Sequence, residues 1–249
     1  MSKETDMNDL TRRVENYWTH RAHDFNTVRR NELHDPISDR WMETIGALLR
    51  PGKTLDILDV GTGTGYFAIL LALRGHRLTG IDLTPAMLTE AEQTAKDFHA
   101  VVDFREMDAQ ALSFPAESFD AVVTRNLTWT LQDPERAYHE WYRVLRPGGV
   151  LINFDADYSQ NIRDENLKAT RTDQSGIYGH VGLTQELARE NAAITLAMPA
   201  AEHERPKWDM EIAKRCGFSS RGADPGAGKR ILQERDLADA PLFLLWARK

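Results

Sequence analysis

Cysteine is nearly absent from this sequence of 249 residues, with Cys216 as its single copy. One cysteine cannot form a disulfide within the chain, and such usage fits a reducing compartment. The first residues are polar and acidic and do not resemble a signal peptide. The longest apolar run, near positions 67–73, is far too short to span a bilayer. These features predict a cytoplasmic protein without a membrane span.

An excess of positive charge is also absent. The chain has 31 Lys and Arg against 38 Asp and Glu, a net charge of −7, and the two signs are interspersed. Proteins that bind a phosphate backbone usually carry a basic patch or stripe, so nucleic acid is not an expected partner. The length suffices for one α/β domain with a sizeable core. Nothing in the sequence predicts the oligomeric state.

A glycine-rich turn is the most informative feature that is present. The apolar run 55–60 reads as a buried strand, and residues 67–73 continue at helical length after the turn. Between them glycine recurs at alternate positions, at Gly61, Gly63 and Gly65. Glycine lets the backbone turn sharply and approach a ligand without an intervening Cβ. Strand, glycine turn and helix in this order predict a nucleotide-binding crevice.

The spacing of these glycines differs from the dinucleotide fingerprint G-x-G-x-x-G. The third glycine comes one residue early, and Tyr66 occupies the position where the fingerprint has Gly or Ala. An acid, Asp59, lies two residues before the first glycine, where it would repel a diphosphate. An acid there can instead order an ammonium group through a water or a backbone amide. A nicotinamide-dependent oxidoreductase on a similar sheet is therefore only the second hypothesis.

The acid followed by x-G-x-G-x-G resembles the first motif of the class I S-adenosylmethionine (SAM) dependent methyltransferases. Further segments resemble the later motifs of that family in the expected order: residues 80–85 with Asp82, 105–109 with Asp108, 119–126, and 143–151 with its Pro-Gly-Gly turn. The similarity covers positions 55–155 and is greatest to the small-molecule branch that includes quinone-biosynthesis methyltransferases. It implies an α/β, Rossmann-like fold with a seven-stranded, mostly parallel sheet flanked by helices.

The resemblance also implies SAM as cofactor and S-adenosylhomocysteine as product. Asp59 would order the methionine amine, Asp82 would hold the ribose hydroxyls, and Asp108 would meet the adenine. The implied cofactor residues are Asp59, Gly61, Thr62, Gly63, Gly65, Asp82, Leu83, Met87, Asp108, Ala109 and Arg125. A non-catalytic SAM-binding regulator on the same fold is the third hypothesis.

The chain reads as one methyltransferase domain with four parts. Residues 1–50 are expected to form a helical cap and residues 51–155 the SAM-binding core, with strands and helices in strict alternation. Residues 156–206 are expected to be a substrate lid inserted after the fifth strand, and residues 207–249 a helix and a β-hairpin. The expected strands lie near 55–60, 77–82, 101–105, 119–124, 149–154 and 242–247.

Methyl transfer from a sulfonium depends chiefly on aligning acceptor, methyl group and sulfur, and a general base is needed only for a protonated acceptor. The catalytic candidates are Asp155, Asn126, His20 and Tyr17, and the substrate-contacting candidates are Trp129, Tyr158, Tyr178 and His180. Alternatives stay open for several of them: Trp129 can pack in the core, Asp155 can be a turn acid, and His20 can lie on a solvated helix face. No metal-binding pattern accompanies these residues.

The acceptor is expected to be a small molecule. The segment after the fourth strand, residues 125–128, reads Arg-Asn-Leu-Thr and lacks the Asn-Pro-Pro-Tyr type of motif. This difference argues against an amino-group methyltransferase that acts on nucleic-acid bases. The sequence does not discriminate among N, O, S and C as the methylated atom.

Overall fold

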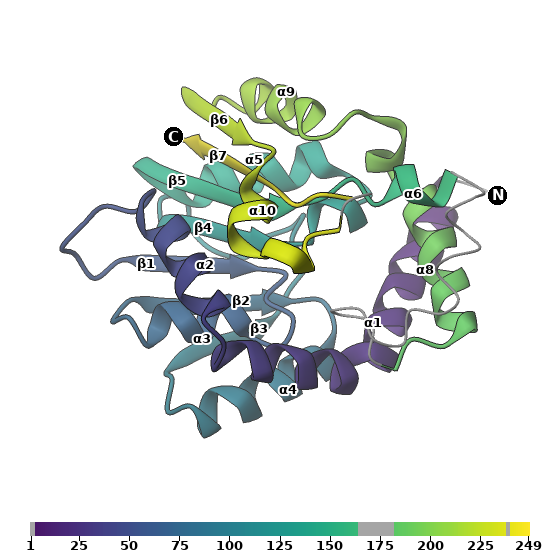
Figure 1. The fold of residues 1–249 in the computed structure, drawn as a ribbon. Coiled ribbons are helices and arrows are strands. Elements are labelled where there is room, and N and C mark those ends of the chain that lie inside the picture. The colour runs from purple at the N-terminus through teal and green to yellow at the C-terminus, as the bar shows by residue number, and fades with distance from the viewer. Residues whose placement is uncertain (1–2, 164–181, 238–239) are drawn as a thin grey trace.

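The computed structural model describes residues 3–163, 182–237 and 240–249. Its centre is a seven-stranded sheet with the order β3-β2-β1-β4-β5-β7-β6 (Figure 1). The strands are β1 (Asp56–Val60), β2 (Arg77–Asp82), β3 (Val102–Glu106), β4 (Phe119–Arg125), β5 (Leu145–Asp155), β6 (Ser220–Asp224) and β7 (Phe243–Arg248). The first five strands pair in parallel, and β7 pairs antiparallel with both β5 and β6. The predicted Rossmann-like, mostly parallel sheet is confirmed.

The central strand β1 is apolar because both faces of the sheet are covered, as is usual for parallel sheets. Successive side chains of a strand point to opposite faces. Ile57 belongs to one core cluster, whereas Leu58 and Val60 belong to the other, and all three are fully buried. The carboxyl ends of β1, β2 and β4 therefore meet at one edge, between two layers of helices.

Helices α2 (Ile37–Gly46), α3 (Tyr66–Ala72) and α10 (Ala227–Ile231) contribute to the core cluster on one face, and α5 (Pro134–Val144) and α9 (Lys207–Arg215) to that on the other. The largest buried side chains are Trp41 of α2 and Trp141 of α5. Trp41 packs edge-on against Phe67 and Phe154, with ring centroids 5.1 and 4.9 Å away. One indole thus joins α2, α3 and β5.

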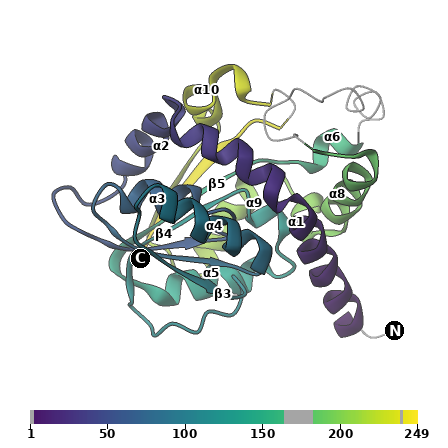
Figure 2. The same ribbon diagram turned by 90° about the horizontal axis from the view of Figure 1, so that it is seen from below.

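Helix α1 (Lys3–Leu33) lies outside this layered core, beside α4 (Pro85–Asp97) and α8 (Gln185–Ala197), as Figures 1 and 2 show. Two ion pairs attach it, one in its first half and one in its last turn. Arg13 contacts Glu190 of α8 at 2.7 Å, and Arg30 contacts Asp97 of α4 at 2.7 Å. Helices α1 and α2 both lie within residues 1–50, where the sequence predicts helices.

The expected strict alternation of strands and helices fails between β3 and β4. Residues 107–118, all of them described, form turns and irregular backbone. Asp108 Oδ1 accepts a hydrogen bond from the backbone N–H of Gln110, which favours a turn over a helix. The Arg143 guanidinium then donates to the carbonyl oxygens of Leu112 and Phe114 and fixes this connection against α5.

The described parts of the expected lid contain short helices. They are α6 (Ser159–Arg163), α8 and the 3₁₀ turn η3 (Pro199–Glu202), and another 3₁₀ turn, η1 (Thr128–Thr130), follows β4. Thr184 is the N-cap of α8, because its Oγ1 accepts a hydrogen bond from the Leu187 N–H in the first turn of that helix. In the C-terminal part, β6 and β7 pair as expected, but α10 and the 3₁₀ turn η4 (Gln233–Arg235) separate them.

Replacing Trp41 by alanine should lower the free energy of unfolding by about 3–5 kcal/mol, because it removes a fully buried indole from the contact between three elements. Urea unfolding monitored by circular dichroism measures this change. The matched control is Leu73→Ala, since the Leu73 side chain is 50% exposed and should change stability by less than about 1 kcal/mol. Equal effects of the two substitutions would contradict the packing role of Trp41.

Candidate functional site

A cleft with about 1160 Å³ of empty space, part of it open to solvent, lies at the carboxyl ends of β1, β2 and β4. Its walls come from the glycine turn, the start of α4, the turn after β3, the loop after β4 and one side of α1. Predicted cofactor residues line it as follows: Asp59, Gly61, Thr62, Gly63, Asp82, Leu83, Met87, Asp108, Ala109 and Arg125. The structure therefore brings together ten residues that the resemblance had implied.

The glycine turn adopts left-handed backbone, with φ of +64°, +54° and +83° at Gly61, Gly63 and Gly65. A Cβ on Gly63 would meet only the Phe25 ring within 4 Å, at 3.7 Å, so this glycine leaves room for a ligand. A Cβ on Gly65 would instead lie 3.0 Å from Phe104 and 3.2 Å from Ala91. Gly65 is not among the residues that line the cleft. Its missing side chain instead allows α3 to pack closely on the sheet.

Asp59 is buried at the end of β1. Its Oδ2 accepts hydrogen bonds from Thr62 Oγ1 at 2.7 Å and from the Ala68 N–H at 3.1 Å, so it fixes the turn and the start of α3. Burial raises the pKa of Asp59 to about 7, because the charged carboxylate loses its hydration there. The group therefore exchanges its proton near neutral pH.

Asp82 connects the two loops that flank the cleft. Its Oδ2 accepts from the Gly63 N–H and its Oδ1 from the Thr84 N–H, both at 2.9 Å. Burial raises its pKa, and hydrogen bonds from Thr84, Gly63 and Leu83 oppose that shift. A carboxylate oxygen accepts about two hydrogen bonds, so each oxygen keeps capacity for a further donor from the cleft.

Hydrogen bonds from α5 and from within the turn itself fix the turn after β3. The indole Nε1 of Trp141 donates to the Ala109 carbonyl at 3.1 Å, and Asp108 is constrained by its bond to the Gln110 N–H. Met107 also lines the cleft here, which the sequence did not predict.

Arg125 lies at the end of β4 among aromatic rings. Its guanidinium carbon is 4.4 Å from the Trp41 ring centroid and 5.3 Å from that of Tyr66. Its Nη1 lies 3.4 Å from Glu32 Oε2, and Arg29 Nη1 lies 2.6 Å from the same oxygen. Burial lowers the pKa of Arg125. Two guanidinium groups thus share one buried carboxylate beside the cleft.

Two buried oxygens next to these arginines have no hydrogen-bond partner among the described residues. They are Glu32 Oε1 and Tyr66 Oη. Burying polar atoms without partners is costly, so such atoms are often the points where a ligand binds. The pair marks a polar end of the cleft.

The two candidates on α1, Tyr17 and His20, do not line the cleft, although other residues of this helix do. The α1 residues that line the cleft are Thr11, Val14, Trp18, Phe25 and Arg29. Tyr17 packs instead against Trp129, Ile194 and Met198. His20 is exposed, and its Nδ1 lies 2.7 Å from the Asn16 carbonyl oxygen. Arg29 had a sequence signal that was not used: Glu32 and Phe25 lie three and four residues away, on the same helix face.

Asn126 lines the cleft in left-handed backbone, with φ of +56°. Tyr158 Oη donates to its Oδ1 at 3.0 Å, and the Trp129 indole N–H donates to its carbonyl at 3.0 Å. Trp129 and Tyr158 themselves are not lining residues; their rings meet edge-on behind Asn126 at 5.5 Å. The other two substrate candidates, Tyr178 and His180, lie outside the described residues.

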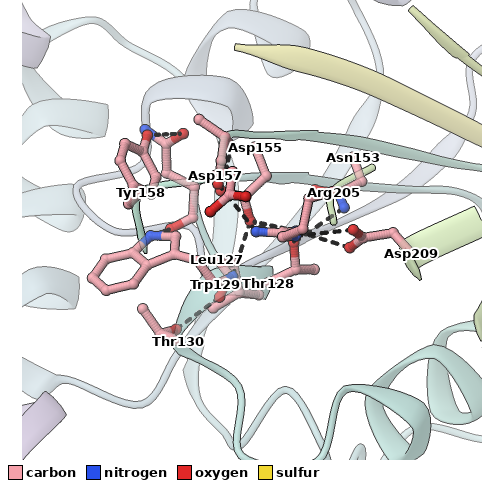
Figure 3. Close-up of polar contacts among 12 residues, drawn as sticks. Leu127, Thr128, Trp129, Thr130, Asn153, Asp155, Asp157, Tyr158, Arg205 and Asp209 are labelled. Atoms are coloured by element: carbon pink, nitrogen blue, oxygen red, sulfur yellow. Dashed lines mark hydrogen bonds and ion pairs between the residues drawn. The ribbon is translucent and has the colours of Figure 1, made fainter. Parts of the chain in front are cut away.

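Asp155 is fully buried and does not line the cleft. Its carboxylate accepts from four donors: the Thr128 hydroxyl, the N–H groups of Trp129 and Ala156, and the Arg205 guanidinium (Figure 3). Burial raises its pKa, while the charge of Arg205 opposes the shift. These contacts hold Asp155 in the interior of the protein, away from the cleft. Its role as a general base therefore stays a prediction.

Metal-binding clusters and membrane-spanning helices are both absent from the described residues. These residues contain no group of three or more His, Cys, Asp or Glu arranged to hold a metal ion. No helix among them has the length and apolar character needed to cross a membrane.

Comparison with known proteins identifies the core. A family model described as a methyltransferase domain matches residues 58–153, the segment that carries the glycine turn, Asp82 and Asp108. Residues 58–153 of this chain are therefore similar to a methyltransferase domain. The resemblance seen in the sequence, and the cofactor class that it implied, are thereby confirmed.

Curated relatives match this same part of the domain. A demethylmenaquinone methyltransferase of Thermus thermophilus is 44% identical over 115 residues, which are 45% of this chain and 52% of that protein. A ubiquinone biosynthesis O-methyltransferase of Pseudomonas putida is 32% identical over 123 residues, 48% of this chain and 51% of that protein. The chain thus spans about half the length of the curated relatives it matches.

Solved structures share the fold of the methyltransferase domain. A putative SAM-dependent methyltransferase of Methanococcus maripaludis aligns with a TM-score of 0.61 at 19% identity and covers 92% of this chain and 91% of its own. Phosphoethanolamine N-methyltransferase 2 of Haemonchus contortus, solved with SAM, aligns with a TM-score of 0.60 at 21% identity over 84% of this chain and 52% of its own. At these identities the likeness concerns the fold.

The raised pKa of Asp59 makes stability depend on pH. The carboxyl titrates near 4 in the unfolded chain and at about 7 in the folded one, so the folded state binds an extra proton between these values. Stability from this group is fully present below pH 4 and is lost as pH rises through 7. Relative to wild type, Asp59→Asn should therefore gain up to about 4 kcal/mol between pH 4 and pH 8.

Urea unfolding of both proteins across this pH range measures the difference. Asparagine keeps the oxygen that accepts from Thr62 and Ala68, so the turn should be preserved. A stability difference that does not change with pH would show that Asp59 stays ionised in the folded protein.

Proposed function

We propose that this protein transfers the methyl group of SAM to a small-molecule acceptor and releases S-adenosylhomocysteine. The observation that carries the proposal is the meeting of Asp59, Asp82 and Asp108 around the glycine turn in one cleft. A diphosphate would be repelled by three carboxylates at this position. A sulfonium cofactor with a ribose and an ammonium group offers them hydrogen-bond donors and positive charge instead.

The cleft offers distinct environments for the parts of SAM. Asp82 has lone pairs free for the two ribose hydroxyls, and Leu83, Met87 and Met107 give apolar walls for the adenine. The space above Gly63 admits the methionine part. Cofactor binding by these residues follows from their chemistry and from the ligand-sized space between them.

Arg29 and Glu32 support a further assignment in the same cofactor site. An α-amino acid group carries one carboxylate and one ammonium. Arg29 lines the cleft and offers donors for the carboxylate, and the Oε1 of Glu32 lies unpaired beside it as an acceptor. We assign the methionine carboxylate to Arg29, on α1.

The remaining cleft wall is apolar. Val14 and Trp18 of α1 face Leu127 and Leu131 of the loop after β4 as lining residues. Such a wall suits an acceptor with an aromatic or apolar body. The relatives named for demethylmenaquinone and ubiquinone biosynthesis act on acceptors of this kind, which supports the same class here.

Among the described residues that line the cleft, the candidate general bases are carboxylates such as Asp59, whose pKa is raised to about 7. No His, Cys or Lys is among those that line the cleft. Transfer to an acceptor that presents a lone pair needs no base, while SAM supplies a methyl group on positively charged sulfur. Asn126 is positioned to contact the acceptor, and His180 stays a predicted base outside the described residues. The single cysteine supports a cytoplasmic site for this reaction.

Calorimetric titration with SAM, S-adenosylhomocysteine and NADH, run in parallel, tests the cofactor. We expect micromolar binding of the first two and none of NADH, and Asp82→Ala should weaken binding roughly 30- to 100-fold because hydrogen bonds to a buried carboxylate are lost. Asp103→Ala is the matched control, since Asp103 forms an exposed pair with Arg105 on the adjacent strand β3. Binding of NADH without binding of SAM or S-adenosylhomocysteine would contradict the methyltransferase proposal and favour an oxidoreductase.

Arg29→Met should weaken binding of S-adenosylhomocysteine roughly 10- to 100-fold through loss of a charge-assisted hydrogen bond. It should leave binding of 5′-methylthioadenosine, which lacks the amino-acid group, nearly unchanged. Calorimetry with both ligands separates this contact from a general loss of structure.

Arg30→Met is the control for this comparison, because the neighbouring arginine pairs with Asp97 at the surface of α4. Equal weakening of both ligands by Arg29→Met would place Arg29 outside the amino-acid site and leave the cofactor assignment itself untouched.

A further inference from the structure

A buried charge cluster lies directly behind the loop that borders the cleft. It consists of Arg205, Asp155 and Asp209, whose side chains are each at most 1% exposed. Arg205 contacts Asp209 Oδ1 at 2.8 Å and Asp155 Oδ2 at 3.3 Å. Figure 3 shows the guanidinium between the two carboxylates. One cation therefore joins the end of β5 to α9 in the interior.

The cluster continues into the loop after β4 through Thr128. The Thr128 hydroxyl donates to Asp155 and accepts from Arg205 and from the Asn153 amide. The Trp129 N–H donates to Asp155 Oδ2 at 3.0 Å. A side chain and a backbone group of η1 are thus both bound to the cluster.

The same loop forms part of the cleft wall. Asn126, Leu127, Thr130 and Leu131 line the cleft. A Cβ added to Gly61 would lie 2.8 Å from Leu127, so this side chain rests directly on the glycine turn. A shift of η1 would move the wall that faces the acceptor and the residue that covers the turn.

Arg205 follows η3 and α8, whose residues pack on the other side of η1. Trp129 shares an apolar cluster with Ile194 of α8 and with Met198. The Arg205 guanidinium also donates to the Ala156 carbonyl at 3.2 Å, where β5 ends. The polar contacts of Arg205 and the apolar contacts of Ile194 and Met198 therefore both attach residues 185–205 to the loop after β4.

We propose that Arg205 is a positioning residue, which acts through Thr128 and Asp155 to hold the loop 126–131 in place as the acceptor wall of the cleft. Every partner of the Asp155 carboxylate is a donor, so an amide at this position would turn an N–H group toward another donor. A lysine at 205 could not meet Asp209, Asp155 and Thr128 together, because its donors radiate from one nitrogen. The inference depends on the proposed function only where it names the acceptor.

Amide hydrogen exchange tests this positioning without a known acceptor. Thr128→Val removes the bridging hydroxyl while leaving both ion pairs, and we expect exchange in residues 126–131 to accelerate at least about tenfold. Strands β1 and β4 should keep their protection, which separates a local release from general destabilisation. Thr128→Ser restores the hydroxyl and should restore slow exchange. Arg205→Lys should accelerate amide exchange in residues 126–131, as Thr128→Val does.

The matched charge control is Arg215→Lys, because Arg215 lies on α9 and forms an exposed pair with Glu135. It should leave exchange in residues 126–131 unchanged. Unchanged exchange in folded Thr128→Val, or equal acceleration throughout the sheet, would overturn the proposal.

Calorimetry with S-adenosylhomocysteine on the same variants separates this inference from the proposed function. We expect affinity within about threefold of wild type, since Asp59, Asp82 and Arg29 are unchanged. If wild type fails to bind S-adenosylhomocysteine, the proposed function fails, and the exchange data still decide the role of Arg205. A loss of affinity as large as that of Asp82→Ala would place the network in the cofactor site and overturn the positioning role.

Discussion

The cleft depends on carboxylates that are buried at strand ends and held by backbone N–H groups. Asp59 ends β1 and accepts from Ala68, Asp82 ends β2 and accepts from Gly63 and Thr84, and Asp155 ends β5 and accepts from Trp129 and Ala156. A buried carboxylate is costly unless donors surround it, so each loop must adopt the conformation that supplies them. The loops around the ligand are therefore fixed from the sheet side, before any ligand binds.

The two ends of the cleft follow different chemistry. The carboxylates Asp59 and Asp82 line the cleft, whereas Asp155, which lies behind the acceptor wall, does not line the cleft and binds donors of the protein itself. The acceptor wall itself is mostly apolar. Under the proposed function, specificity for the cofactor would come from hydrogen bonds, and specificity for the acceptor from shape and from the position of the loop after β4.

Much of the fold was predictable because its signals are local. The apolar strands, the glycine turn and the acids after β1, β2 and β3 are set by neighbours close in the sequence, and they appear at nearly the expected positions. The connection between β3 and β4 was not predictable from periodicity, because a side-chain bond from Asp108 and distant donors from Arg143 determine its path.

The same distinction between local and distant determinants applies to the candidate site. The implied cofactor residues gather in the cleft, apart from Gly65, whose need for glycine comes from the approach of Phe104 on another strand. The face that α1 presents to the cleft depends on how the helix rests on α4 and α8, so Arg29 and Trp18 could not be distinguished from Tyr17 and His20 by spacing alone. Asp155 was correctly placed at a strand end, but its partner Arg205 is 50 residues away in the sequence.

Helix α1 differs from the rest of the cleft in how it is held. Its attachments at Arg13 and Arg30 are partly exposed ion pairs, which are individually weak and screened by salt. The sheet edge beneath it is held by buried groups that open only with much larger loss of structure. Raising the salt concentration should therefore weaken the contacts of α1 at Arg13 and Arg30, while the buried contacts of Glu32 with Arg125 and of Tyr17 with Trp129 keep the helix attached.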